Sequence, residues 1–108
     1  MPKEPTGARV AFGDIAPALA EITDKVLFGN VWEREGLNPR DRSLVTIASL
    51  ISLYRGNELP FHMKKGLENG LTRDEIVETI THLAFYSSWP TAMTALNIAR
   101  KVFEDADA

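Results

Sequence analysis

The chain has 108 residues, 44% of them apolar, and its 15 acidic and 12 basic side chains give a net charge of −3. This length fits one domain without a separate cofactor module, and the interspersed charge offers no basic stripe for nucleic acid. Because the chain has no cysteine, disulfides, thiolate metal ligands and thiol redox chemistry are excluded.

The chain also lacks the usual signals for a metal, a phosphate or a membrane. Its two histidines do not form an H-E-x-x-H motif or a histidine-carboxylate cluster, so no metal is expected. No glycine-rich phosphate loop is present. The start of the chain is polar rather than a signal peptide, and the longest apolar stretch, residues 44–53, is too short to span a membrane. We therefore expect a cytoplasmic protein.

Prolines and glycines divide the first part of the chain. Residues 1–13 hold two of each and predict a loose N-terminal arm, followed by a single helical domain over residues 14–108. The first helix is predicted over residues 14–29, with Asp14 as its N-cap and Pro17 in its first turn. Its apolar side chains fall at helical spacing: Ile15, Leu19, Ile22, Val26 and Leu27.

The next two helices have clear boundaries. Asn38 and Pro39 open a helix predicted over residues 40–54, which is apolar around much of its circumference and belongs in the centre of a bundle. A third helix is predicted over residues 59–68 and ends at Asn69-Gly70, a C-terminal glycine signal.

Two further helices complete the prediction. The spacing of Thr72 and Glu75 is that of a capping box, which predicts a helix over residues 72–86. The last helix is predicted over residues 90–103, with a frayed acidic tail after it. No segment alternates apolar and polar residues between hairpin signals, so the fold class is all-α.

Few side chains could transfer protons. His82 and Tyr86 lie four residues apart, so they share one face of the predicted helix. His62 lies in the first turns of the third helix, with Tyr54 and Glu58 as further candidates. Spacing alone favours a structural role for each histidine, and the His82/Tyr86 pair fits an ordinary helix face equally well.

Arg42 and Trp89 each have two interpretations. Asp41 suits the positive end of a helix dipole, and Arg42 could pair with it, or with Glu33 or Glu35. Alternatively, the Arg42 guanidinium could bind a substrate carboxylate. Trp89, which precedes a proline, could be a hydrophobic plug at a helix junction.

Six motifs, in order along the chain, resemble those of the carboxymuconolactone decarboxylase family, within the alkylhydroperoxidase D-like superfamily. They are NPRDRSLVTIA (residues 38–48), ELPFH (58–62), GLENGLT (66–72), EIVE (75–78), THLAFY (81–86) and WPTA (89–92). The resemblance covers about residues 28–103. It implies a compact fold of five to six helices whose protomers associate, typically as a hexamer built as a trimer of dimers.

The family has two chemical branches. The branch similar to alkylhydroperoxidase D reduces peroxide with a Cys-x-x-Cys pair, which a chain without cysteine cannot do. The other branch resembles 4-carboxymuconolactone decarboxylase of the β-ketoadipate route of aromatic catabolism. There, a butenolide loses CO2 from its γ carbon, and the electrons move through the ring double bond into the lactone carbonyl. Proton delivery then yields an enol-lactone, with neither metal nor organic cofactor.

The resemblance implies roles for six side chains. His62 would stabilise the oxyanion or donate the proton, with His82 and Tyr86 as auxiliary donors. Substrate binding would fall to Arg42, Glu58 and Trp89. The expected partners are a small carboxylated substrate and further copies of this chain, without nucleic acid or membrane.

Two other functions stay open. One is a different histidine-mediated proton transfer on an unidentified metabolite. The other is a non-catalytic oligomeric binding or scaffold protein in which the histidines are structural. Inward-facing histidines around a pocket favour an enzyme, whereas histidines dispersed on the outer surface favour a scaffold.

Overall fold

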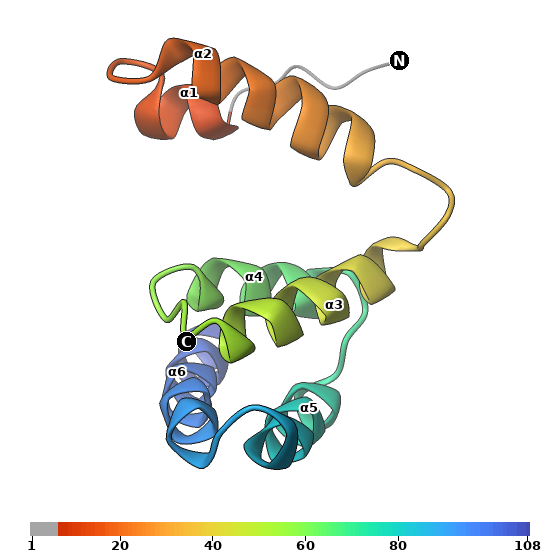
Figure 1. Cartoon of the computed structure of the whole chain (residues 1–108), viewed down its shortest axis with the longest axis vertical. Helices are drawn as coiled ribbons and strands as arrows, with labels where there is room; N and C mark the ends of the chain where they lie inside the picture. Colours follow the sequence, from red (N-terminus) through yellow and green to blue (C-terminus); the bar gives the residue numbers. More distant parts are fainter. Residues whose placement is uncertain (1–6) are drawn as a thin grey trace. The chain divides into compact units, whose positions relative to one another are not determined.

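A computed structural model describes residues 7–108, which contain six α-helices, one π-helix and no strand. The expected all-α class is confirmed. The chain divides into two compact units, Met1–Pro39 and Arg40–Ala108, which are coloured red to yellow and yellow to blue in Figure 1. No helix within residues 7–108 combines the length and apolar character needed to cross a membrane.

The first unit contains α1 (Gly7–Phe12), α2 (Pro17–Ile22) and the π-helix η1 (Thr23–Val31). Helix α1 lies where the loose arm was expected; the rest of that predicted arm, residues 1–6, falls outside the described residues. The buried Asp24 carboxylate accepts the backbone N–H of Ala8 at 2.9 Å and of Arg9 at 3.1 Å. These bonds satisfy donors that the first turn of a helix leaves open, so Asp24 stabilises α1.

The predicted first helix differs in its bounds and winding. It begins at Pro17 with Ala16 as its N-cap, and the Asp14 side chain does not cap it. Beyond Ile22 the chain continues as η1, where the Trp32 N–H donates to the Leu27 carbonyl at 3.0 Å, five residues back. The helical winding therefore reaches further than residue 29.

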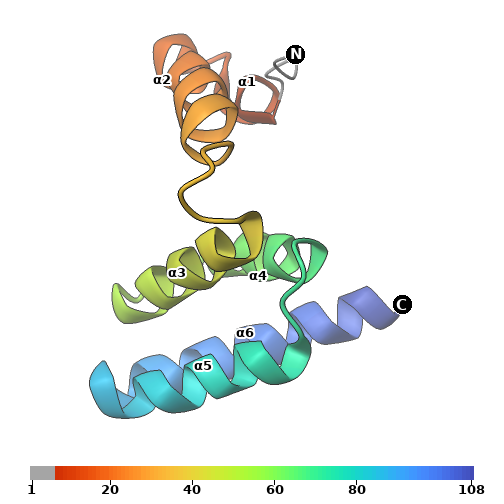
Figure 2. The same cartoon turned by 90° about the vertical axis from the view of Figure 1, so that its right-hand side faces the viewer.

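The second unit contains α3 (Pro39–Ser52), α4 (Leu59–Glu68), α5 (Arg73–Tyr86) and α6 (Trp89–Asp107). In both views α3 and α4 lie side by side, and α5 and α6 form a second pair beneath them (Figures 1 and 2). The core between the pairs includes Ile47, Ile51, Leu59, Met63, Ile76, Ile80, Ala95 and Ala99. The bounds of α3, α4 and α5 match the predicted ones closely.

The predicted frayed tail is helical instead. Helix α6 continues to Asp107, whose carboxylate pairs with both terminal nitrogens of the Arg73 guanidinium. Arg73 lies at the start of α5, and α5 packs along α6. The end of the chain is therefore held by a contact to a residue 34 positions earlier.

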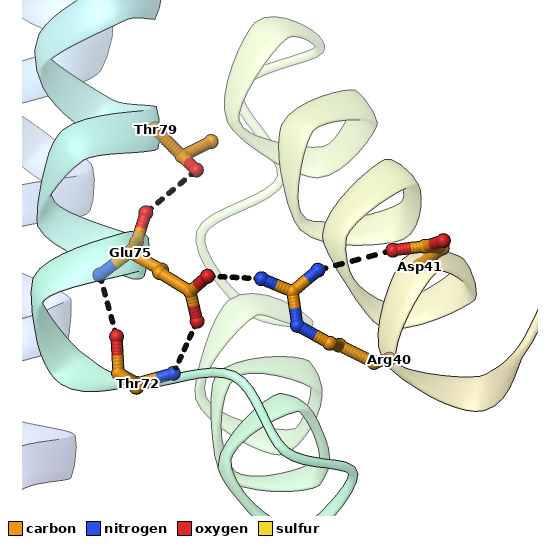
Figure 3. A network of polar contacts seen from close by, with 5 residues as sticks. All are labelled: Arg40, Asp41, Thr72, Glu75 and Thr79. Carbon is orange, nitrogen blue, oxygen red and sulfur yellow. Dashed lines mark hydrogen bonds and ion pairs between the residues drawn. The ribbon is translucent and has the colours of Figure 1, made fainter.

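The start of α5 is also joined to the start of α3. Thr72 and Glu75 form the predicted capping box, because each side chain bonds the other's backbone N–H. The Glu75 carboxylate also pairs with Arg40, and Arg40 donates to Asp41 at 3.1 Å (Figure 3). Asp41 is thus paired with Arg40, whereas the expected partner was Arg42.

Candidate active site

His62 lies in the first turn and a half of α4, with its ring half-buried. The Phe61 ring meets it edge-on, with centroids 4.9 Å apart. Burial lowers the pKa of His62 below its ordinary value, the nearby Lys65 charge lowers it further, and Glu58 opposes the change. His62 is therefore a neutral imidazole at neutral pH, able to donate one N–H hydrogen bond.

His82 and Tyr86 share a face of α5 as predicted. Their rings stack with centroids 4.7 Å apart and an interplanar angle of 21°. Both side chains are exposed, Tyr86 to 79%. At the following turn the Phe85 ring meets Trp89 edge-on at 5.6 Å. His82, Phe85, Tyr86 and Trp89 thus form an exposed aromatic cluster at the junction of α5 and α6.

The predicted substrate-binding residues lie apart along the chain. Arg42 is partly buried in the first turn of α3. Glu58 is the N-cap of α4, where its carbonyl accepts the His62 N–H at 3.3 Å. Trp89 is 59% exposed, so it is not a buried plug in this chain.

The described contacts join four of the six residues into two pairs. Glu58 lies one helical turn from His62 and influences its charge. His82 contacts Tyr86 on α5. None of the contacts described above connects the first group to the second, so their convergence on one substrate stays a prediction.

A hollow of 270 Å³ opens between the α3–α4 connection and α6. Its lining consists of Tyr54, Arg55, Gly56, Asn57, Glu58 and Thr94. Of these, Tyr54 and Glu58 were candidates from sequence. The others occupy a loop or a polar helix position and have no periodic pattern, so they could not be recognised from the sequence. Across residues 7–108, no three or more histidine or carboxylate side chains gather in a metal-binding arrangement.

A match to a family model assigns the chain to a known family. Residues 17–101 match the model of the carboxymuconolactone decarboxylase family. The chain is a member of that family, and the resemblance noted from its motifs is confirmed.

Three individual proteins are similar in sequence to this chain. The chain is 44% identical over 78 residues to 4-carboxymuconolactone decarboxylase of Acinetobacter baylyi, covering 72% of this chain and 58% of the relative. It is 33% identical over 85 residues to nitrosuccinic acid decarboxylase of Metarhizium robertsii, covering 79% and 59%. It is 28% identical over 99 residues to an uncharacterised 15.0 kDa protein of Paracoccus denitrificans, covering 90% and 74%. The chain thus spans about three fifths of the length of the two named decarboxylases.

Proposed function

We propose that this chain is a cofactor-independent carboxy-lyase that converts a carboxylated butenolide into an enol-lactone and CO2 in aromatic catabolism. Family membership and two relatives named as decarboxylases support decarboxylation. The greater identity is to the relative named for 4-carboxymuconolactone, which makes that lactone the first substrate to test.

The reaction needs no external electron acceptor. The bond between the γ carbon and its carboxylate breaks, and the electron pair moves through the ring double bond to the lactone carbonyl oxygen. CO2 leaves and a dienolate forms, which takes one proton on the carbon beside the carbonyl. The protein must stabilise the oxyanion and supply that proton.

The half-buried His62 is the observation that carries the proposal. Burial holds the pKa of His62 below its ordinary value, so the neutral imidazole presents one ring N–H that can donate to the developing oxyanion. A donor held in a partly desolvated place acts more strongly than one in water. His82 and Tyr86 are the proposed auxiliary donors of the proton, and Arg42, Glu58 and Trp89 the proposed substrate contacts.

The test is direct conversion of 4-carboxymuconolactone by the purified full chain. Loss of substrate absorbance should accompany release of one CO2 and appearance of the enol-lactone by NMR. Neither product should form faster than in buffer alone if the proposal is wrong.

A second candidate is the decarboxylation of a different acid. The two named relatives bear the names of different acids, so relatives of this chain differ in the acid for which they are named. Nitrosuccinate should therefore be assayed beside the lactone, and conversion of nitrosuccinate alone would favour this candidate. Conversion of neither would favour the non-catalytic alternative, for which the exposure of His82 and Tyr86 argues.

We also propose that the protein is a homo-oligomer, specifically a hexamer built as a trimer of dimers. Many large apolar side chains are more than half exposed in one copy, including Val10, Ile15, Leu19, Ile22, Val26, Val45, Leu53, Phe61 and Phe85. Covering such surface in water is favourable. We propose that further copies of this chain bury these apolar side chains.

A further inference from the structure

Two helices of the second unit end in the same way, but with different residues at the critical position. At the end of α4, the Leu71 N–H donates to the Gly66 carbonyl at 2.9 Å. The Gly70 N–H donates to the Leu67 carbonyl at 3.2 Å. At the end of α3, the Arg55 N–H donates to Leu50 at 2.8 Å and the Tyr54 N–H to Ile51 at 3.0 Å. Both are Schellman motifs, which require a left-handed residue and favour glycine there.

Glycine occupies that position in one motif and tyrosine in the other. Gly70 has a φ of 108°, and Tyr54 has a φ of 60°, the one positive φ of a non-glycine residue within residues 7–108. A side chain with a β-carbon is strained in this region. Such strain persists at sites where the side chain has a use that glycine cannot supply.

Core packing does not explain the tyrosine. The Tyr54 side chain is 63% exposed. Its hydroxyl accepts a hydrogen bond from the Thr94 hydroxyl at 3.3 Å, across to α6. Both residues line the 270 Å³ hollow. The strained position therefore sets a phenol at the wall of a hollow rather than in the core.

The remaining lining of the hollow is rich in donors. Arg55 contributes a guanidinium that makes no ion pair with any side chain in residues 7–108, and Asn57 contributes an amide. A guanidinium fork binds a carboxylate through two parallel N–H bonds. Glu58 is the opposing charge in the lining, so it weakens the binding of an anion there.

We infer that this hollow binds the carboxylate of a small organic acid, with Arg55 as its anchor and Tyr54 and Asn57 as positioning donors. The inference rests on the proposed function in one respect: the bound group would be a second carboxylate of the proposed substrate, distinct from the one lost as CO2. Glu58 lines the hollow one turn before His62, so the hollow and the proposed catalytic histidine both lie near the start of α4.

This assignment differs from the one made from sequence. Arg42 was the expected carboxylate anchor, but it lies 13 residues before Arg55, at the other end of α3. The helical part of that separation, from Arg42 to Ser52, is about 15 Å long. The hollow thus favours Arg55 over Arg42 for a carboxylate held beside Glu58.

Binding of 2-furylacetate to the full chain tests the inference independently of catalysis. This probe carries a five-membered ring and one carboxylate, and 2-furylacetamide is its uncharged match. NMR titration should move the backbone amide signals of Arg55, Gly56 and Asn57, and Arg55→Gln should weaken binding by about tenfold or more. Arg100→Gln, at an exposed arginine of α6 outside the lining, is the matched control and should stay within about twofold. Glu58→Gln should strengthen binding, because it removes the opposing charge.

Each alternative outcome decides against the inference. Parental affinity in folded Arg55→Gln, equal binding of the acid and the amide, or no saturable binding at millimolar probe overturns it. So does a tenfold loss in Arg42→Gln alone. Arg55-dependent binding by a chain that converts no lactone would instead uphold the hollow and refute the proposed function.

Discussion

The ends of α3 and α4, which share the Schellman motif with Tyr54 and Gly70 at the left-handed position, provide a quantitative test of backbone strain. We predict that Tyr54→Gly is more stable than Tyr54→Ala, because both variants lose the ring but only glycine relieves the left-handed strain. At the matched position we predict that Gly70→Ala lowers the free energy of unfolding, because alanine introduces the left-handed strain. At Gly70 an added β-carbon meets no atom within 4 Å, so steric clash does not contribute.

The size of the effect follows from two opposing contributions. Left-handed backbone costs a residue with a β-carbon about 1–2 kcal/mol. Replacing alanine by glycine relieves that cost but loses about 0.4–1 kcal/mol of stability, because glycine makes the unfolded chain more flexible. We therefore expect a difference of roughly 1 kcal/mol at each position.

Urea denaturation of the full chain, followed by circular dichroism, measures these free energies of unfolding. The wild-type tyrosine itself should contribute little beyond its single exposed hydrogen bond to Thr94. Tyr54→Gly should thus remain within about 1 kcal/mol of wild type. A loss of more than about 2 kcal/mol in Tyr54→Gly would show that the ring is a packing element, and the reasoning from strain would fail.

Three further predictions address the cap, the histidine and the assembly. Asp24→Asn should speed hydrogen exchange at the Ala8 amide by about tenfold or more, because a charge-assisted bond is lost; unchanged exchange would mean that Asp24 does not hold α1. Decarboxylation should fall on acidification through a pKa below the ordinary histidine value, because the neutral His62 is the active form. Lys65→Met should move this fall in rate to higher pH, because it removes the charge that lowers the pKa of His62. An unchanged pH profile in Lys65→Met would show that His62 is not the group that titrates. Light scattering at micromolar concentration should report several times the chain mass of 12.0 kDa, and a clean monomer would refute the proposed oligomer.

Local signals predicted the second unit well. The Asn69-Gly70 stop, the capping box at Thr72 and Glu75, and the prolines at helix starts are short-range features whose physics is complete within a few residues. The observed bounds of α3, α4 and α5 accordingly lie close to the expected ones.

Contacts between distant residues explain most of the differences. Helix α1 is capped by Asp24, 16 residues later in the chain, and no pattern within residues 7–12 announces that partner. The end of α6 is held by Arg73, 34 residues earlier. Acidic composition alone predicted fraying there because it carries no information about such a partner.

The sequence proposed side chains for the candidate site but not the shape of the site. It offered His62 and the His82/Tyr86 pair as candidates, and the stacking of that pair follows from helical spacing. It did not identify Arg55 or Thr94, because the hollow forms only when the end of α3 approaches α6. A tyrosine at the position where a helix end favours glycine was the available signal.

Decarboxylation by the His62→Ala variant tests the central claim most directly. The rate constant for conversion of 4-carboxymuconolactone should fall by about 10²–10³-fold, which is the loss expected for one oxyanion donor. Lys64→Ala, an exposed change on the same helix, should keep the parental rate and serves as the control. A folded His62→Ala variant that decarboxylates the lactone at the parental rate would contradict the account.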